Sequence, residues 1–172
     1  MIESYCMPLQ PADLPDLQRY FERLSPETKS RFGPHRFDLL TLKFIYQAND
    51  QHLGYLIRKS DDHEIIGYSA VKGGYLEHDA NRLQRYGLAL SEKLDCTFAP
   101  SLADDYQGHG FGSKMFDYIL MDLKTKGFRR IILWGGVQCN NHRAVRYYEK
   151  LGFRSVGQFE YNGLNLDMLL DI

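Results

Sequence analysis

The chain has 172 residues and a net charge of −1, with 44% hydrophobic and 25% charged residues. This composition is typical of one globular domain over residues 1–172, and the near-neutral charge argues against nucleic acid or a membrane surface as a partner. No apolar run is long enough to cross a membrane, and the first residues lack an export signal, so we expect a cytoplasmic protein. The three cysteines and six histidines show no metal-ligand spacing, so we expect reduced thiols and no metal site.

Helical signals follow an initial strand in the first third of the chain. Residues 2–9 are expected to form that strand, and apolar side chains recur at helical spacing from Leu14 to Leu24. A second helix is expected to begin at Ser25-Pro26, with the serine as its cap and the proline in its first turn. Asp38 can cap a third helix that runs to about Ala48.

Strand signals dominate the rest of the chain. Apolar runs between turn residues predict strands at residues 53–58, 64–72, 86–90, 95–102 and 128–134. A short helix is expected from Asp79. Near the end of the chain, Asn162-Gly163 is a strong turn signal, which predicts a hairpin of residues 155–161 and 165–170.

One proline conflicts with its predicted strand. Pro100 lies inside residues 95–102, where it has no N–H to donate to a sheet ladder. From the residues alone, the simplest interpretation is that this strand ends before Pro100.

The most informative stretch joins that strand to a long amphipathic helix. It reads Gln107-Gly108-His109-Gly110-Phe111-Gly112, and the helix is expected to begin at Ser113. Glycines at alternate positions leave few side chains, so backbone N–H groups can approach a ligand closely. Because N–H groups at the positive end of a helix bind phosphate, we predict a phosphate-binding loop here.

The spacing of this loop excludes two common phosphate motifs. Gly112-Ser113-Lys114 lacks the ending of a P-loop, and the glycines do not match the dinucleotide fingerprint. The pattern Gln-x-x-Gly-x-Gly, here Gln107, Gly110 and Gly112, resembles the acetyl-CoA pyrophosphate loop of the GCN5-related N-acetyltransferases, the GNAT family. A glycine-rich turn that only starts a helix is the alternative interpretation.

A second stretch resembles the other motif of the same family. Residues 141–153 match Asn-x-x-Ala-x-x-x-Tyr-x-x-x-Gly-Phe, with the tyrosine at Tyr148. Asn141 can cap the start of a helix that Gly152 ends in the left-handed conformation. Both motifs occur in the family's order, and the resemblance covers about residues 2–170.

The resemblance implies a fold and a co-substrate. The fold class is α/β (α+β), with a mixed, mostly antiparallel central sheet that has splayed fourth and fifth strands and is flanked by helices. In that fold the pantetheine arm of acetyl-CoA lies between the splayed strands, so Pro100 would remove a donor where no partner strand is available. Leu102 and Ala103 would then offer backbone groups to the pantetheine amides.

The resemblance also assigns residues to the binding of acetyl-CoA, which serves as co-substrate. The expected cofactor-binding residues are Leu102, Ala103, Gln107, Gly108, His109, Gly110, Phe111, Gly112, Ser113 and Asn141. Four basic residues near the motifs either meet the adenosine phosphates or are ordinary solvated helix residues: Lys114, Arg143, Arg146 and Lys150.

Tyr148 is the expected catalytic residue, because the tyrosine of this motif reaches the cofactor sulfur in the family. With an ordinary pKa of about 10, its phenol is protonated at neutral pH and can donate a proton to the departing thiolate of CoA. A packing role is the alternative, and Tyr147 fits that role equally well. The general base stays unassigned. Many relatives carry a glutamate at the position of Cys96, which leaves Asp95, Glu92 or a water chain as candidates.

The expected function is acetyl transfer from acetyl-CoA to a primary amine by direct attack in a ternary complex. The acceptor is a small-molecule or protein amine, and the family would place it against residues 32–37 and 77–85. Candidate lining residues are Arg36, His78, Arg82 and Tyr86. A catalytically idle acyl-CoA-binding sensor or interaction module is the main alternative, and an unrelated nucleotide-binding protein is another. No nucleic acid or membrane partner is expected, and a homodimer is left open.

Overall fold

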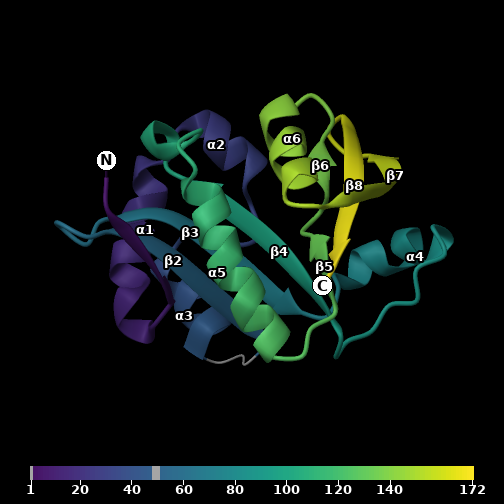
Figure 1. The fold of residues 1–172 in the computed structure, drawn as a ribbon, viewed down its shortest axis with the longest axis horizontal. Helices are drawn as coiled ribbons and strands as arrows, with labels where there is room; N and C mark the ends of the chain where they lie inside the picture. Colours follow the sequence, from purple (N-terminus) through teal and green to yellow (C-terminus); the bar gives the residue numbers. More distant parts are fainter. Residues whose placement is uncertain (1, 48–50) are drawn as a thin grey trace. The chain divides into compact units, whose positions relative to one another are not determined.

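A computed structural model describes residues 2–47 and 51–172 of the chain (Figure 1). The helices are α1 (Leu14–Arg23), α2 (Pro26–Arg31), α3 (Leu39–Gln47), α4 (Glu77–Arg85), α5 (Phe111–Thr125) and α6 (His142–Lys150). The strands are β1 (Ser4–Pro8), β2 (His52–Lys59), β3 (Ile65–Gly73), β4 (Asp95–Leu102), β5 (Arg130–Leu133), β6 (Val137–Gln138), β7 (Arg154–Glu160) and β8 (Leu164–Asp171). Short 3₁₀ turns lie at η1 (Pro11–Asp13) and η2 (Asp104–Tyr106). In the part of the chain that is described, no helix has the length and apolar character needed to cross a membrane.

The chain forms two compact units, and each is described by itself. Unit 1 comprises Met1–Val71 and Ala99–Asp122, and unit 2 comprises Lys72–Phe98 and Leu123–Ile172. Strands β3 and β4 and helix α5 contribute residues to both units. The assignment of residues 1–172 to one domain therefore stays a prediction.

Unit 1 is a sheet covered on both faces. Its strands are hydrogen-bonded in the order β1-β2-β3-β4, with β1 antiparallel to β2. Neighbouring residues of β3 face opposite sides, as the pleat requires. Tyr68 meets Phe21 of α1 with ring centroids 5.3 Å apart, while the hydroxyl of Ser69 points to the sulfur of Met115 on α5, 3.6 Å away. Helix α1 therefore packs on one face and α5 on the other.

The caps that the sequence predicts in unit 1 are present. The backbone N–H of Thr28 donates to the hydroxyl of Ser25 at 3.1 Å at the start of α2. The backbone N–H of Thr41 donates to the carboxylate of Asp38 at 2.9 Å at the start of α3. Ala48, where the third helix was expected to end, lies outside the described residues.

Unit 2 contains the second half of the sheet. Its strands follow the order β3-β4-β5-β8-β6, and β7 pairs with β8. Strands β4 and β5 are parallel, whereas β5, β6 and β7 are each antiparallel to β8. The predicted hairpin turn is confirmed, because Asn162 has φ +49° and Gly163 has φ +105°. Leu83, Ile132 and Leu169 form a buried apolar cluster beside this sheet.

The prediction of an edge strand at residues 86–90 is wrong. These residues form a turn and an irregular segment after α4. The apolar alternation that suggested a strand has another cause, because Tyr86, Leu88 and Leu90 pack against the cluster of Leu83, Ile132 and Leu169. The Tyr86 hydroxyl also donates a hydrogen bond to the Asp167 carboxylate at 3.0 Å, which anchors the turn by its side chain.

Pro100 does not end its strand. Strand β4 runs through Pro100 to Leu102, but its register with β5 ends at the pair Phe98–Leu133. The carbonyl of Phe98 accepts the N–H of Trp134 at 2.9 Å, so Phe98 points to the β5 side and so does Pro100, two residues on. The missing N–H of Pro100 therefore faces an edge where the β5 register has already ended.

Candidate functional site

The glycine loop connects β4 to α5 within unit 1. Gly108 and Gly110 have φ of +81° and +86°, a region that side chains rarely adopt. A Cβ at either glycine would have no atom within 4 Å, so the backbone here borders open space. Helix α5 begins at Phe111, earlier than the expected Ser113, and its first turn closes with the N–H of Lys114 donating to the carbonyl of Gly110 at 3.1 Å. The N–H groups of such a first turn have no acceptor within the helix.

Polar side chains hold this loop in place. The amide of Gln107 donates to the carbonyl of Leu102 at 3.0 Å and to the hydroxyl of Thr28 at 3.3 Å. Asp104 accepts hydrogen bonds from the hydroxyls of Ser25 and Thr28, both at 2.7 Å, and from the N–H of Ser25 at 3.0 Å. Partial burial opposes its charge, but these bonds outweigh burial and lower the pKa of Asp104. No local sequence pattern predicts these bonds, because Ser25 and Asp104 are 79 positions apart.

The two residues expected to meet the pantetheine amides differ in orientation. The N–H of Ala103 donates to the carbonyl of Ile66 in β3 at 2.9 Å, and its carbonyl accepts the N–H of Tyr106 at 2.9 Å. The backbone N–H and carbonyl of Leu102, the preceding residue, therefore point to the edge of β4 opposite β3. Of these two residues, Leu102 presents its backbone on the edge that carries Pro100.

Lys114, which follows the loop in the first turn of α5, bonds β1 rather than the loop. The ammonium group of Lys114 donates to the carbonyl of Ser4 and to the hydroxyl of Ser4 at 3.0 Å, so it ties α5 to β1. His109 is exposed within the loop.

The second motif lies in unit 2 and has the expected caps. The side chain of Asn141 accepts the N–H of Ala144 at 3.3 Å, and Gly152 ends α6 with φ +93°. The ring of Tyr148 is half-buried and meets the ring of Phe153 edge-on at 5.5 Å. Burial raises the pKa of Tyr148, so its phenol stays protonated at neutral pH. Its hydroxyl has no hydrogen-bond partner among the described residues, so it is available to a ligand.

The start of β4 provides no general base. The buried Asp95 carboxylate accepts two hydrogen bonds from Arg130, at 3.0 and 2.8 Å, and a third from the N–H of Ser91 at 2.8 Å. These three bonds fasten the carboxylate to β5 and to the segment before β4, so it serves to join these segments. Cys96 is fully buried, and burial together with the neighbouring Asp95 charge raises the pKa of its thiol to about 12. Both residues are therefore structural.

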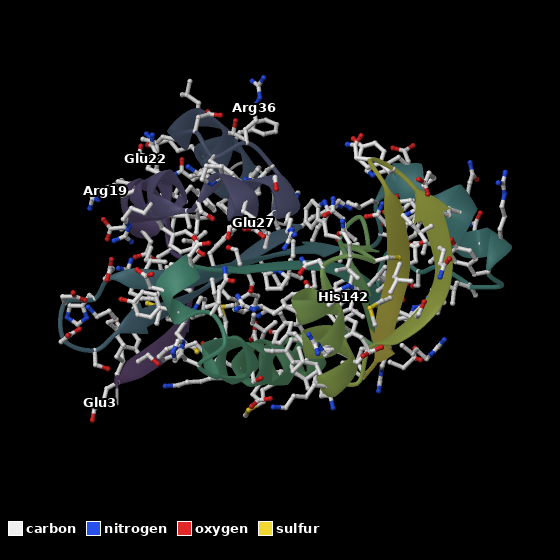
Figure 2. All side chains as sticks on the ribbon, turned by 90° about the horizontal axis from the view of Figure 1, so that it is seen from above. Glu3, Arg19, Glu22, Glu27, Arg36 and His142 are labelled. Carbon is white, nitrogen blue, oxygen red and sulfur yellow. The ribbon has the colours of Figure 1, made fainter. Side chains whose placement is uncertain are left out.

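The candidate acceptor-lining residues of unit 2 belong to a structural cluster. The guanidinium of Arg82 donates to Asp167 at 2.7 and 3.0 Å, pairs with Asp79 at 2.8 Å, and lies 3.7 Å from the centre of the Phe159 ring. Its charge is thus already compensated. His78 is exposed beside this cluster, and in unit 1 Arg36 is exposed and projects outward (Figure 2).

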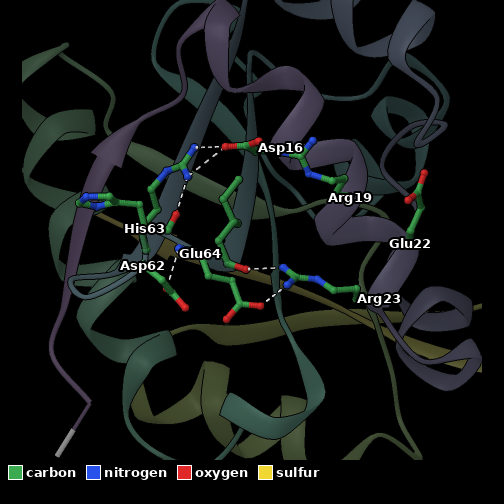
Figure 3. Close-up of a pocket in the computed structure, with 9 residues that line it drawn as sticks. Asp16, Arg19, Glu22, Arg23, Asp62, His63 and Glu64 are labelled. Atoms are coloured by element: carbon green, nitrogen blue, oxygen red, sulfur yellow. Dashed lines mark hydrogen bonds and ion pairs between the residues drawn. The ribbon is translucent and has the colours of Figure 1, made fainter.

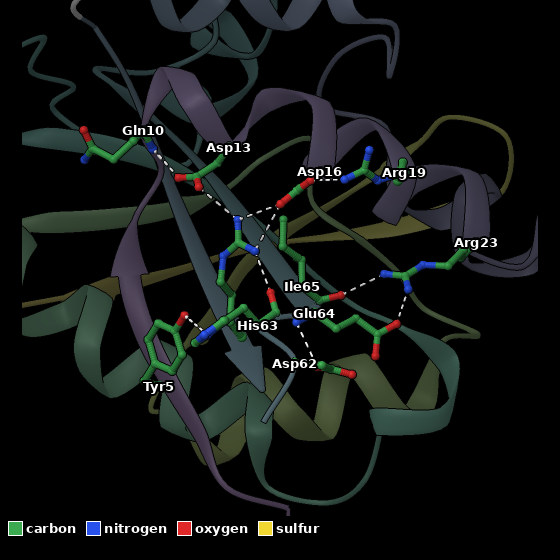
Figure 4. A network of polar contacts seen from close by, with 11 residues as sticks. Tyr5, Gln10, Asp13, Asp16, Arg19, Arg23, Asp62, His63, Glu64 and Ile65 are labelled. Atoms are coloured by element: carbon green, nitrogen blue, oxygen red, sulfur yellow. Dashed lines mark hydrogen bonds and ion pairs between the residues drawn. The ribbon is translucent and has the colours of Figure 1, made fainter. Parts of the chain in front are cut away.

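A polar pocket of about 350 Å³ lies elsewhere in unit 1, between α1 and the β2–β3 turn (Figure 3). Its lining is charged, but the charges pair with one another: buried Arg58 bonds Asp13 at 2.9 Å, Arg19 pairs with Asp16, and Arg23 pairs with Glu64 (Figure 4). This network fastens α1 to the β2–β3 turn without needing a ligand, so we do not treat it as the functional site.

The sheet, the parallel β4–β5 pair and the glycine loop before α5 define an α/β protein with a glycine-rich loop at the start of a long helix. The family model of the acetyltransferase (GNAT) family matches residues 17–153. The chain therefore belongs to the GNAT family, whose members use acetyl-CoA as the acyl donor. This confirms the family, the fold class and the co-substrate expected from the two motifs.

Relatives and solved structures agree with this assignment. The chain is 32% identical to a mycothiol acetyltransferase of Corynebacterium efficiens over 93 residues, which are 54% of this chain and 25% of that protein. The chain thus spans about a quarter of the length of this curated relative. Among solved structures, a ribosomal-protein-S5-alanine acetyltransferase from Vibrio fischeri has a TM-score of 0.74 at 15% identity, covering 99% of this chain and 94% of that chain. An aminoglycoside acetyltransferase in complex with coenzyme A has a TM-score of 0.69 at 19% identity, covering 98% and 95%. At these identities, the solved structures show the fold alone.

Proposed function

We propose that this protein transfers an acetyl group from acetyl-CoA to a primary amine by direct attack in a ternary complex. The observation that carries the proposal is Gly110, which has φ +86° and open space at its Cβ position directly before α5. This backbone fits a pyrophosphate, because N–H groups at a helix start can reach phosphate oxygens without hindrance from side chains.

We assign cofactor binding to three parts of the chain: the glycine loop with the first turn of α5, the end of β4, and the start of α6. Gly108, His109 and Gly110, with the first turn Phe111, Gly112 and Ser113, would hold the pyrophosphate through their backbone. The side-chain amide of Gln107 ties this loop to the end of β4 by its hydrogen bond to the carbonyl of Leu102. Leu102 would offer its backbone N–H to the pantetheine arm, and Asn141 would meet the cofactor while it caps α6. The expected role of Ala103 is not proposed again, because its N–H and carbonyl already bond Ile66 and Tyr106.

Tyr148 would act as the general acid. Acetyl-CoA supplies an activated acyl group, and transfer leaves a thiolate that needs a proton. The Tyr148 phenol can do this because it is protonated at neutral pH, where burial raises its pKa further, and because its hydroxyl has no partner among the described residues. After each transfer, solvent restores the proton of Tyr148.

The acceptor is a small-molecule or protein amine. The relatives named mycothiol acetyltransferases match only part of this chain, and the aminoglycoside acetyltransferase shares only its fold. A catalytically idle acyl-CoA-binding module is the second candidate. The ion pairs of Asp95 and Arg82 favour it, because neither side chain is then available as a catalytic group.

The test is release of CoA thiol from acetyl-CoA with a panel of amines: an aminoglycoside, a polyamine, free amino acids and peptides with a free N-terminus. We expect amine-dependent release together with a product heavier by one acetyl group in mass spectrometry. Acetyl-CoA binding in calorimetry without turnover on the whole panel would support the idle module instead.

A further inference from the structure

Unit 1 contains a hydrogen-bonded row of three titratable side chains that take no part in cofactor binding or in protonation of the thiolate. The hydroxyl of Tyr46 in α3 bonds the hydroxyl of Tyr68 in β3, and the Tyr68 hydroxyl lies 2.7 Å from Nε2 of His35. Nδ1 of His35 lies 2.8 Å from the carbonyl of Arg36. Tyr68 is fully buried, whereas Tyr46 and His35 are half-buried at the two ends of the row.

The partners fix the direction of every hydrogen bond in this row. A carbonyl oxygen can only accept, so Nδ1 of His35 carries the proton and donates it to Arg36. In the neutral ring Nε2 is then an acceptor, and Tyr68 must donate to it. Tyr68 in turn accepts from Tyr46. The row therefore points its protons from Tyr46 toward His35. Among the described residues, the Tyr46 hydroxyl has no hydrogen bond other than the one to Tyr68, so its oxygen can accept another proton.

The row is attached to the part of β4 that carries Pro100. The hydroxyl of Ser101 donates to the carbonyl of Tyr68 at 3.2 Å, and it also bonds the hydroxyl of Tyr20 at 2.9 Å. Ser101 follows Pro100 directly, beyond the last β4–β5 pair. Within unit 1 the row thus lies beside the strand segment to which cofactor binding is assigned.

We propose that Tyr46, Tyr68 and His35 form the proton relay of the transfer reaction. The Tyr46 oxygen accepts a proton from the nitrogen of the acceptor amine, and the relay ends at Nε2 of His35. The relay rests on the proposed function and supplies the base that β4 lacks. As the C–N bond forms and the C–S bond breaks, the nitrogen gives its proton to the Tyr46 oxygen. Tyr46 passes its own proton to Tyr68, and Tyr68 passes its proton to His35. The reverse shift returns the proton to solvent after the product leaves, while Tyr148 protonates the thiolate.

The surroundings of the row suit a relay. Burial lowers the pKa of His35, although the bond to Arg36 and the charge of Asp38 oppose this, so the ring is neutral and ready to accept a proton at neutral pH. Phe21 of α1, Phe37, Tyr46 and Tyr68 face the ring, and of these only the two tyrosines titrate. Burial raises the pKa of both tyrosines, so each phenol carries a proton before the reaction begins.

The tautomer of His35 can be tested without any acceptor. Long-range ¹H–¹⁵N NMR on the full chain with ¹⁵N-labelled histidine, with and without CoA, reports which nitrogen is protonated, and His35→Gln identifies the signal. At pH 7 we expect a neutral ring protonated at Nδ1. A ring protonated at Nε2, or a charged ring at pH 7, would overturn the relay.

The relay itself is tested by single-turnover transfer to an amine that the panel identifies. Tyr46→Phe removes only the outer hydroxyl, and we expect the transfer step to slow by about 10²-fold or more at unchanged CoA affinity. Tyr20→Phe is the matched control, because it removes a buried hydroxyl from the same aromatic cluster but not from the row. In wild type the transfer rate should fall as pH drops through the lowered pKa of His35, and His35→Gln should lose this acidic limb.

The outcomes separate the relay from the function it serves. Amine-dependent release that is equally fast in wild type, Tyr46→Phe and His35→Gln would overturn the relay and leave the acetyltransferase in place. An equal loss in Tyr46→Phe and Tyr20→Phe would also overturn it, because packing would then explain both. The absence of turnover on every amine would overturn the proposed function, and the catalytic role of the relay with it.

Discussion

At the scale of single residues, Gly110 carries the prediction on cofactor affinity. Gly110→Val should abolish most CoA binding, because the side chain would fill the open space in front of the α5 N–H groups. The positive φ would also cost about 1–2 kcal/mol of stability. Gly87→Val is the matched control, since Gly87 has φ +82°, has equally open surroundings and belongs to unit 2 rather than to the loop. Calorimetry should show lost CoA affinity in Gly110→Val alone. Equal affinity in both folded variants would refute the pyrophosphate assignment.

Tyr148 carries the residue-scale prediction on chemistry. Tyr148→Phe keeps the contact with Phe153 and removes only the hydroxyl, so CoA affinity should hold while single-turnover acetyl transfer slows by about 10²–10⁴-fold. Tyr147→Phe removes the neighbouring hydroxyl and should leave the transfer rate nearly unchanged. Equal transfer rates in wild type and Tyr148→Phe, measured where chemistry limits the rate, would leave Tyr148 as a packing residue.

At the scale of elements, the end of the β4–β5 register decides the effect of Pro100. Pro100→Ala restores an N–H, but that N–H would face an edge beyond the pair Phe98–Leu133. We therefore expect little change in CoA affinity and in the urea midpoint. A continuous pairing would instead gain about 0.5–1.5 kcal/mol from the new hydrogen bond. A clearly raised midpoint with an unchanged slope would show that β4 is paired at Pro100.

The pair of Asp95 and Arg130 joins the parallel strands β4 and β5. Both side chains are largely buried, with 3% and 15% of their surface exposed, so Asp95→Asn leaves an uncompensated charge. We expect a loss of about 3–5 kcal/mol in urea denaturation. Asp171→Asn breaks the exposed pair with Arg154 and should change stability little. If Asp95 were the base, folded Asp95→Asn would lose the transfer step, whereas we expect that step to persist.

At the scale of the whole molecule, buried groups that hold their protons predict weakness in alkali. The pKa of Cys96 rises to about 12, and burial also raises the pKa of Tyr20, Tyr68 and Tyr148. A folded pKa above the unfolded value stabilises the protein fully below the unfolded pKa, about 8.5 for Cys and about 10 for Tyr, and this stability is lost as pH rises further. The urea midpoint should therefore fall from pH 8.5 upward.

A cysteine substitution separates the contributions to this alkaline loss. Cys96→Ala should flatten the decline between about pH 8.5 and 10, where the unfolded thiol ionises before the tyrosines do. Cys139→Ala serves as the control for removal of a thiol outside the core. The same slope in wild type and Cys96→Ala would show that the buried thiol does not contribute.

The sequence by itself determined the parts of this protein that depend on local chemistry. The caps at Ser25, Asp38 and Asn141, the turn at Asn162-Gly163 and the glycine loop are set by residues within a few positions of one another, so their patterns could be recognised directly. The family followed from two such local patterns in the right order.

The tertiary structure decided whatever depends on distant partners. The alternation at residues 86–90 looked like a strand until the contacts of Tyr86 showed a turn packed on the core. Asp95 and Arg82 looked available until their partners, 35 and 85 positions away, compensated their charges. The row from Tyr46 through Tyr68 to His35 has no sequence signature, because α3, β3 and the segment after α2 meet only on folding. Local spacing encodes backbone conformation, but the burial and pairing of a titratable group depend on which distant segments pack around it.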